Sequence, residues 1–379
     1  MSNPTSPVVD LAKALIACES ITPNDAGCQK IIKKRLALAG FHCESMHFGE
    51  VENLWAKVGS AGPLVLFVGH TDVVPTGDVN DWTSPPFTPD IRDGQLYGRG
   101  ATDMKGAIAA MIIAVESFRK KNPEHQGAIG FILTSDEEGP ATHGTRMVVE
   151  QLIARGEKID YCVIGEPSSD KKIGDQIRVG RRGSLHGHVT INGIQGHVAH
   201  PHLAKNPIHA SMQVFHDLAH TEWDHGTKDF PPTTFQITNI HSGTGATNVI
   251  PGHLEAKFNF RFSTAVGIDK IKERTEHQFK KHGLNFDIQW NVGAEPFLTN
   301  HGKLIEATQL AIRDVAAQSV KLSTGGGTSD GRFIAPTGAE LIELGTIHAT
   351  AHHVDEHIAI SDLEKLTLMY EKILENLLG

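Results

Sequence analysis

Four groups of histidine and acidic residues contain side chains that can bind a metal ion or transfer a proton. They are His70 with Asp72, Asp103 within residues 98–106, Glu137 with Glu138, and Glu166 within residues 165–168. Imidazole nitrogen and carboxylate oxygen are the ligands of hydrolytic zinc sites, and two metals about 3.5–4 Å apart need a shared oxyanion ligand. Each acid alone would be an ordinary turn residue. Together the four groups predict metal-assisted hydrolysis, if the fold brings them to one place.

The spacing within two of the groups suggests how the work is divided. His70 and Asp72 are two residues apart, so on an extended segment their side chains point the same way. A carboxylate or carbonyl commonly accepts the second ring N–H of a metal-bound imidazole, and we expect Asp72 to orient His70 in this way. Glu137 and Glu138 are neighbours that point differently, so one can bind metal while the other takes a proton from water.

The elements that must position these groups are short apolar runs alternating with amphipathic helical stretches, as in α/β folds. The clearest strand is 64–68, which leads directly into His70. Further strands are expected at 41–48, 54–58, 128–134 and 161–164, and helices at 8–18, 28–38, 105–119 and 143–154. Because open α/β sheets bind ligands beyond the carboxyl ends of their strands, the groups should share one edge of the sheet.

The pattern changes near residue 181 to strict two-residue alternation, best seen in 254–262, which is typical of strands with one buried face. With helices expected at 207–218 and 267–281, this segment has the order β-α-β-β-α-β of a ferredoxin-like unit. The first pattern then returns, with a helix at 301–316, a glycine-rich loop at 325–331, a strand at 339–344 and a helix at 361–377. We therefore predict a catalytic domain of residues 1–180 and 294–379 with an inserted domain of residues 181–293.

The composition excludes several classes of protein. The 379 residues contain 35 Lys and Arg against 44 Asp and Glu, and the net charge of −9 argues against a nucleic-acid or anionic-membrane partner. Four cysteines without CxxC spacing are too few for a disulfide scaffold and favour a reducing compartment. With no targeting segment evident and no apolar run long enough to span a bilayer, we predict a cytoplasmic protein. Histidine is frequent, with 23 copies.

The four groups, in this order, resemble the motifs of the dinuclear zinc amidohydrolases and peptidases, a superfamily that includes acetylornithine deacetylase and carboxypeptidase G-type enzymes. Three further motifs, at 180–185, 195–207 and 325–333, are similar to those of the succinyl-diaminopimelate desuccinylase family within it. The resemblance covers essentially the whole chain. It implies an α/β fold, in which a mixed-sheet catalytic domain with helices on both faces is interrupted by a ferredoxin-like α+β domain for dimerisation and lid closure.

The resemblance also implies two Zn²⁺ ions per subunit, with Co²⁺ as an alternative in one or both sites. His70 and Glu166 would bind one metal, Glu138 and His352 the other, and Asp103 would bridge them. The last ligand has competitors, because His348, His353 and His357 crowd the same stretch. His352 is the choice because residues 349–356 resemble the run Ala-Thr-x-His-x-Val-Asn-Glu, although Asp355 stands where Asn is common.

For catalysis, the resemblance implies a bridging hydroxide as nucleophile, with Glu137 as general base and then acid and Asp72 as the partner of His70. His197 of the inserted domain would stabilise the oxyanion from the other subunit of a homodimer, unless it is an ordinary surface residue beside His200 and His202. The reaction would be hydrolysis of N-succinyl-L,L-2,6-diaminopimelate in lysine and diaminopimelate biosynthesis.

Such a substrate, a dicarboxylate derived from an amino acid, requires cationic, hydroxyl and amide groups. Five candidates lie in the matching motifs: Arg181, Ser184, Asn248, Arg261 and Thr328. Arginine suits the task because its planar fork binds a carboxylate through two hydrogen bonds. Arg182 competes with Arg181 for this role, and Arg261 could equally be a solvated strand residue.

Three other interpretations are open. Residues 327–331 match the GxSxG nucleophile elbow, with Asp355 and His357 downstream, but glycines stand where that motif needs a strand. A non-catalytic metal-binding protein would have no use for Glu137 beside Glu138. Among enzymes, the alternative is acetylornithine deacetylase or a related aminoacyl hydrolase, because the metal ligands are shared across the superfamily.

Overall fold

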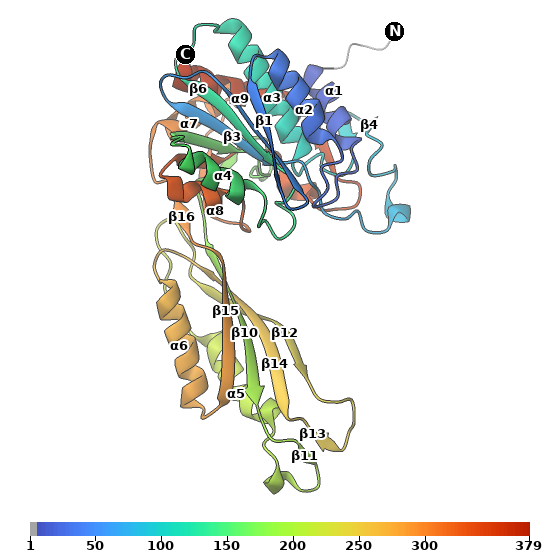
Figure 1. Cartoon of the computed structure of the whole chain (residues 1–379), viewed down its shortest axis with the longest axis vertical. Helices are drawn as coiled ribbons and strands as arrows, with labels where there is room; N and C mark the ends of the chain where they lie inside the picture. The colour runs from blue at the N-terminus through green and yellow to red at the C-terminus, as the bar shows by residue number, and fades with distance from the viewer. Residues whose placement is uncertain (1–5) are drawn as a thin grey trace. The chain divides into compact units, whose positions relative to one another are not determined.

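The computed structural model describes residues 6–379, and the chain forms two compact units (Figure 1). The first unit comprises the described part of Met1–Gly180 together with Leu298–Ser323 and Ser329–Gly379. The second comprises Arg181–Phe297 and Thr324–Thr328, so residues 294–297 and 324–328, expected in the catalytic domain, group with the second unit. Residues 1–5 of the expected catalytic domain lie outside the described residues.

A mixed eight-stranded sheet forms the centre of the first unit. Its strands, in spatial order, are β1 (His42–Phe48), β2 (Val51–Val58), β6 (Ala128–Thr134), β3 (Leu64–His70), β7 (Tyr161–Ile164), β18 (Glu340–Glu343), β8 (Gln176–Arg178) and β17 (Lys321–Ser323). Strands β6, β3, β7 and β18 are neighbours and run parallel to one another. Every residue of β3 and β6 is buried, because helices cover both faces of the sheet there.

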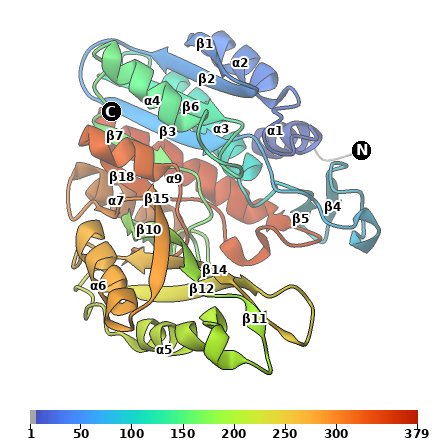
Figure 2. The same ribbon diagram turned by 60° about the horizontal axis from the view of Figure 1, so that its bottom comes forward.

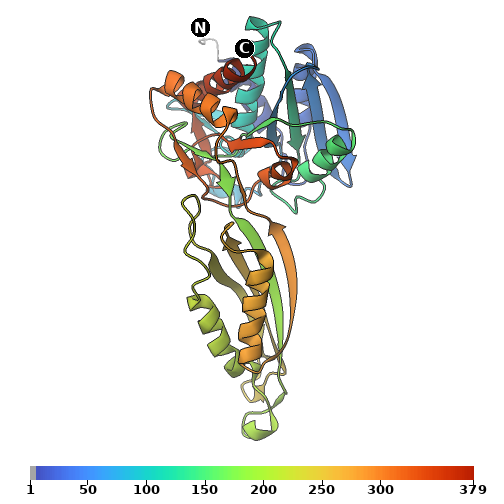
Figure 3. The ribbon, with the colours of Figure 1, turned by 90° about the vertical axis from the view of Figure 1, so that its left-hand side faces the viewer.

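Alternate side chains of β3 point to opposite faces of the sheet, each of which is covered by a layer of helices. Val65 and Phe67 belong to one apolar core with α1 (Pro7–Ile16), α2 (Cys28–Leu38), α3 (Lys105–Lys121), α7 (Lys303–Ala316) and α9 (Ile360–Leu378). Leu66 and Val68 are equally buried but point to the opposite face, where α4 (Thr145–Ala154) and the short α8 (Gly331–Ile334) lie (Figure 3). The predicted α/β class, a mixed sheet with helices on both faces, is therefore confirmed.

A small antiparallel sheet joins distant parts of the first unit. It consists of β19 (His357–Ala359), β5 (Gln95–Tyr97) and β4 (Asp90–Arg92), with Ile358 opposite Leu96. The pairing brings the segment before α9 next to the loop that contains Asp103. The described residues also contain four single turns of 3₁₀ helix: Val79–Asp81, Pro201–Leu203, Ala335–Thr337 and His348–Thr350.

The second unit is a four-stranded antiparallel sheet covered on one face by two helices (Figure 2). Along the chain the elements are β10 (Gly183–Asn192), α5 (Pro207–His220), β12 (Thr234–Ser242), β14 (His253–Phe262), α6 (Ile268–Lys281) and β15 (Asn285–Ala294), and the spatial order is β12-β14-β10-β15. The predicted β-α-β-β-α-β order is confirmed. Leu254 and the alternate residues up to Phe262 are buried against the helices, as the alternation requires. A two-stranded extension pairs β11 (Gly196–His197) with β13 (Val249–Ile250).

Short elements are where sequence prediction and structure differ most. Strands β4, β5, β8, β17 and β19 have three residues each, too few to show a period, and they were not predicted. The helix expected from residue 301 begins at Lys303, after Gly302 with φ 141°. The two-residue strands β9 (Gly180–Arg181) and β16 (Phe297–Leu298) occur where the chain passes between the units. Among residues 6–379, no helix is long and apolar enough to cross a membrane.

Candidate metal-binding active site

The candidate ligands follow four neighbouring parallel strands of the first unit. His70 is the last residue of β3, Glu138 follows β6, Glu166 follows β7, and His352 follows β18. Because β6, β3, β7 and β18 run parallel, their carboxyl ends meet at one edge of the sheet. The fifth residue, Asp103, lies just before α3. The candidate ligands therefore lie at one edge of the sheet, as the sequence predicts.

Three overlapping groups of side chains could each hold a metal ion, and Asp103 belongs to two of them. In the His70 site (His70, Asp103 and Glu166), Nε2 of His70 lies 3.2 Å from Asp103 Oδ1 and 3.5 Å from Glu166 Oε1. In the His352 site (Asp103, Glu138 and His352), Nε2 of His352 lies 2.8 Å from Glu138 Oε1 and 3.3 Å from Asp103 Oδ2. Asp103 therefore turns one carboxylate oxygen toward each site, as a bridging ligand requires.

The chemistry of this donor set fits a pair of divalent cations. Two imidazoles and three carboxylates converge in a largely buried cluster, and Oε1 of Glu166 is buried with no hydrogen-bond partner among the described residues. A buried carboxylate oxygen without a partner is costly unless a cation neutralises it. Nitrogen and oxygen donors of this kind accept both zinc and cobalt.

Without metal, protons take the place of the cations in this cluster. Burial raises the pKa of Glu166 to about 7, and the charge of Asp103 adds to the effect. Hydrogen bonds to Asp103 and Glu138 raise the pKa of His352 to about 10. Burial alone would raise the pKa of Asp103, but hydrogen bonds to His352 and His70 bring it below its ordinary value. The raised pKa values of Glu166 and His352 show that this acidic cluster favours bound protons, and it would favour a metal cation for the same reason.

Glu137, the candidate base, lies beside the candidate metal ligands. Its carboxylate lies with His70 and Glu138 in a third group whose ligand atoms are all within 4.8 Å of one another. Burial, followed by the negative charge of Glu166, raises the pKa of Glu137 well above its ordinary value. A carboxylate whose pKa is raised can both accept a proton and return it during a reaction.

Asp72 contacts both His70 and the loop that carries the two glutamates. The backbone carbonyl of Asp72 accepts the Nδ1–H of His70 at 2.9 Å, whereas the Asp72 carboxylate is 3.7 Å from that nitrogen. The carboxylate instead accepts the backbone N–H groups of Glu137 and Glu138, at 3.3 and 3.1 Å. Of the two possible acceptors, the backbone carbonyl is thus the partner of the imidazole, because the carboxylate of Asp72 binds the next loop. Nε2 of His70 therefore points toward Asp103 and Glu166, the other residues of the His70 site.

Of the four histidines between residues 348 and 357, His352 is the one whose ring reaches the cluster. Its backbone has φ 63°, a left-handed conformation that turns the chain sharply at this point. The others make different contacts: His348 lies 3.5 Å from Asp170, the ring of His357 packs against Tyr97, and the side chain of His353 is exposed. This geometry favours His352 as the last ligand.

Two buried acids near the cluster were not identified from the sequence. Asp330, whose Oδ2 accepts the hydroxyl of Thr145 at 2.5 Å, contributes negative charge that raises the pKa of Glu137. Burial raises the pKa of Asp330 itself to about 6. Glu356 is completely buried and binds the loop before Asp103. Its position four residues after His352, in the same motif, was the available signal.

The expected substrate-binding residues belong to the second unit or its boundary and form three local groups. Ser184 lies opposite Arg261 on neighbouring strands. Nη1 of Arg181, a buried residue, donates to the carbonyl of Gly325 at 3.0 Å, in the same short segment as Thr328. His197 is exposed on β11, and the next residue, Val198, donates its N–H to the carbonyl of Asn248 at 3.1 Å.

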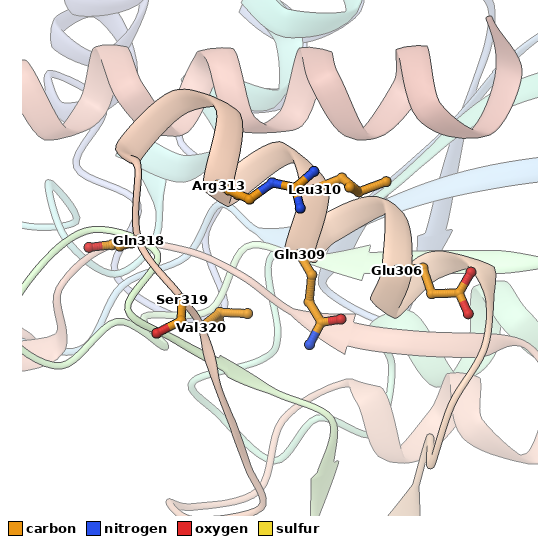
Figure 4. Close-up of a pocket in the computed structure, with 7 residues that line it drawn as sticks. All are labelled: Glu306, Gln309, Leu310, Arg313, Gln318, Ser319 and Val320. Carbon is orange, nitrogen blue, oxygen red and sulfur yellow. The ribbon is translucent and has the colours of Figure 1, made fainter.

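The serine-nucleophile interpretation is wrong in its geometry. Ser329 is buried, and its hydroxyl donates to Glu343 Oε1 at 2.5 Å rather than to a histidine. The Asp355 carboxylate accepts hydrogen bonds from Thr83, and Nδ1 of His357 contacts the backbone carbonyl of Asp355 instead. A pocket lined by α7 and the segment after it, residues 306–320, contains none of the candidate site residues (Figure 4).

The chain is similar along nearly its whole length to several known proteins. A succinyl-diaminopimelate desuccinylase of Alkalilimnicola ehrlichii is 54% identical over 99% of this chain and 100% of its own, and one of Acinetobacter baumannii is 55% identical over 99% of each. Among solved structures, the M20 metallo-carboxypeptidase Sso-CP2 of Sulfolobus solfataricus has a TM-score of 0.80 at 18% identity, covering 98% of this chain and 99% of its own. The Bacillus subtilis YXEP protein, a dinuclear metal binding peptidase, has a TM-score of 0.74 at 17% identity, covering 97% and 96%. Residues 66–376 match the model of peptidase family M20/M25/M40, and the chain belongs to this family.

Proposed function

We propose that the protein hydrolyses the amide bond of N-succinyl-L,L-2,6-diaminopimelate to succinate and L,L-diaminopimelate, a step of lysine and diaminopimelate biosynthesis. The observation that carries the proposal is the pair of metal sites sharing Asp103, with Glu137 beside them. The relatives named above support the desuccinylase over acetylornithine deacetylase, since they match along nearly their whole length.

The metals would be held by the residues already described. His70 and Glu166 would bind one ion and Glu138 and His352 the other, with Asp103 between them. Bound Zn²⁺ or Co²⁺ supplies a Lewis acid that polarises the amide carbonyl and lowers the pKa of water. Zinc is proposed with cobalt as the alternative in one or both sites, because the nitrogen and oxygen donors present here accept both metals.

Glu137 performs the proton transfers. Its carboxylate accepts a proton from the attacking water and holds it, which its raised pKa favours. The same carboxyl then donates the proton to the leaving nitrogen, because an amine cannot depart as an anion. Asp72 keeps Glu137 in place through the backbone of the loop. General acid–base catalysis of this kind contributes about 10²–10⁴-fold to a rate.

Substrate binding falls to the second unit in this proposal. Arg181 and Arg261 would bind carboxylates of the substrate, with Ser184, Asn248 and Thr328 as further hydrogen-bonding partners.

His197 would donate to the oxyanion from the partner subunit of a homodimer formed through the inserted domain. Its Nδ1 accepts the N–H of Ala199 at 3.0 Å, so the neutral ring carries its proton on Nε2, available for donation.

Co-expression of two inactive variants tests the shared site. Glu137→Gln subunits lack the base and His197→Ala subunits lack the oxyanion donor. In a mixed dimer, one of the two sites regains both groups if His197 acts across the interface. Activity should therefore return when the variants are co-expressed and stay absent in each alone. No recovery in isolated mixed dimers would show that His197 does not act in the neighbouring site.

Metal removal tests the reaction class. Treatment with a chelator should abolish desuccinylation, and addition of two equivalents of Zn²⁺ or Co²⁺ should restore it, while a serine-trapping reagent should have no effect. Activity that persists after complete metal removal would overturn the proposal.

A cytoplasmic location stays a prediction, supported by four cysteines that are free thiols.

A further inference from the structure

The buried carboxylate of Glu356 binds the loop that leads to the shared metal ligand. Its Oε1 accepts the backbone N–H groups of Thr102 at 2.8 Å and Asp103 at 2.9 Å. Its Oε2 accepts the backbone N–H of Gly100 at 2.9 Å and Nη1 of Arg99 at 2.8 Å. Glu356 is 0% exposed, so water does not compete for these four bonds. Hydrogen bonds to a charged acceptor are stronger than neutral ones, and each carboxylate oxygen is fully used.

The same contacts fix the segment that carries His352. Nη1 of Arg99 also donates to the carbonyl of His353 at 3.1 Å, and the backbone carbonyl of Glu356 accepts the N–H of Gly98 at 2.9 Å. The hydroxyl of Thr102 lies 2.8 Å from the carbonyl oxygen of His357. Residues 98–103 and 352–357 are thereby joined into one structure, with Glu356 at its centre.

The two metal sites depend on this structure to different extents. In the His352 site, two of the three residues, Asp103 and His352, lie on the segments joined by Glu356. In the His70 site only Asp103 does. His70 ends the fully buried strand β3 and Glu166 lies two residues after β7, so the sheet itself holds them.

We propose that Glu356 is a positioning residue that sets the relative placement of Asp103 and His352, and that the His352 site requires it more than the His70 site does. The inference rests on the two-metal site of the proposed function. Glu356 touches neither substrate nor metal in this account, and acts only through the two ligands.

The substitution Glu356→Gln tests the proposal with little change in size. An amide has one oxygen and one NH₂ group, so the NH₂ would face two of the four N–H donors. We expect the zinc in the His352 site to bind about 10–100-fold more weakly, which is the usual effect of losing a hydrogen-bond partner that orients a metal ligand. The zinc in the His70 site should be weakened by less, because only Asp103 of its three residues lies on the segments joined by Glu356. Zinc content after dialysis against graded chelator measures both affinities, and the visible absorption of the Co²⁺-loaded protein reports the ligand geometry of each site.

Glu371→Gln is the matched control. Glu371 is also a buried acid, accepting bonds from Lys121 at 2.5 Å and Ser117 at 2.8 Å. Lys121 ends α3, whereas Asp103 lies just before its start, which separates the two acids by roughly 25 Å at 1.5 Å per residue. The control should lower the unfolding temperature and leave both metals and the Co²⁺ spectrum unchanged.

Arg99→Lys is the second test variant, and it decides the outcome if Glu356→Gln does not fold. It keeps the carboxylate and its backbone donors but removes the guanidinium that bridges Glu356 and His353, so it should weaken the zinc in the His352 site in the same direction by less. Two zinc ions bound as tightly as normal, with an unchanged Co²⁺ spectrum, in Glu356→Gln or in a folded Arg99→Lys would overturn the inference. Equal loss from both sites would also overturn it. An unchanged protein that binds fewer than two metals would instead refute the two-metal site itself.

Discussion

The carboxylate of Asp72 accepts the backbone N–H of Glu138, with 3.1 Å between Oδ2 and N. Asp72 follows β3 and Glu138 follows β6, so this bond ties together the loops at the ends of two neighbouring strands. The other carboxylate oxygen makes the same contact to the residue before Glu138. A single buried side chain therefore sets the position of a candidate metal ligand, Glu138, and of the proposed base, Glu137, relative to β3.

This arrangement predicts the effect of Asp72→Asn. The amide cannot accept both N–H groups, because one oxygen becomes an NH₂ donor, and the loop with Glu137 should shift. We expect kcat to fall about 10–100-fold, as for other groups that orient metal ligands. Steady-state kinetics with the succinylated substrate measures the change. Asp175→Asn is the control, since Asp175 accepts three backbone N–H groups from residues 170–172, none of them a candidate site residue, and its kcat should be unchanged.

Glu137→Gln should separate metal binding from catalysis. The amide has nearly the same shape but cannot carry the proton, so kcat should fall at least about 10²–10⁴-fold. Zinc content should stay at two per subunit, because Glu137 belongs to neither the His70 site nor the His352 site. Elemental analysis and kinetics on one preparation check both. An unaltered rate would remove Glu137 from the mechanism.

Neighbouring histidines allow a direct test of the last ligand. His352→Ala should reduce zinc to one equivalent per subunit, since its ring is 2.8 Å from Glu138 and 3.3 Å from Asp103. His353→Ala should retain two, because that side chain is exposed and only its backbone carbonyl is used. The reverse result would make His353 the ligand.

Metal binding should release protons, and more of them at pH 6 than at pH 8. In the metal-free protein the pKa of His352 is about 10 and that of Glu166 about 7. At pH 8 His352 is protonated and Glu166 is not, whereas at pH 6 both carry protons that a metal must displace. The apparent affinity for Zn²⁺ should therefore fall as the pH is lowered from 8 to 6. Calorimetry in two buffers with different ionisation enthalpies counts the protons, and equal release at both pH values would contradict these assignments.

The part of the site on the central strands could be predicted from sequence, for a physical reason. Buried parallel strands are continuous apolar runs, and their ends must carry the polar groups, so His70 and Glu166 are visible as residues that follow such runs. Other features could not be predicted. The left-handed backbone at His352 and Asp355 is unusual for residues other than glycine, and no local pattern announces it.

Long-range contacts account for the remaining differences. The bonds from Glu356 to the loop before Asp103 join residues more than 250 positions apart, which no periodicity reveals. The contact of the Asp72 carboxylate could not be predicted for the same reason, because it binds a loop 65 residues further along the chain. Three-residue strands such as β8 are defined by their neighbours in the sheet rather than by their own sequence.

The most direct test of the proposed function is the comparison of two substrates by the zinc-loaded protein. Values of kcat/KM for N-succinyl-L,L-2,6-diaminopimelate and N-acetylornithine, measured on the same preparation, report which acyl group and amino acid the site favours. The account predicts a clear preference for the succinylated substrate, with that activity lost in Glu137→Gln. A preference for the acetylated substrate, or no hydrolysis of the succinylated one by protein holding two zinc ions, would contradict it.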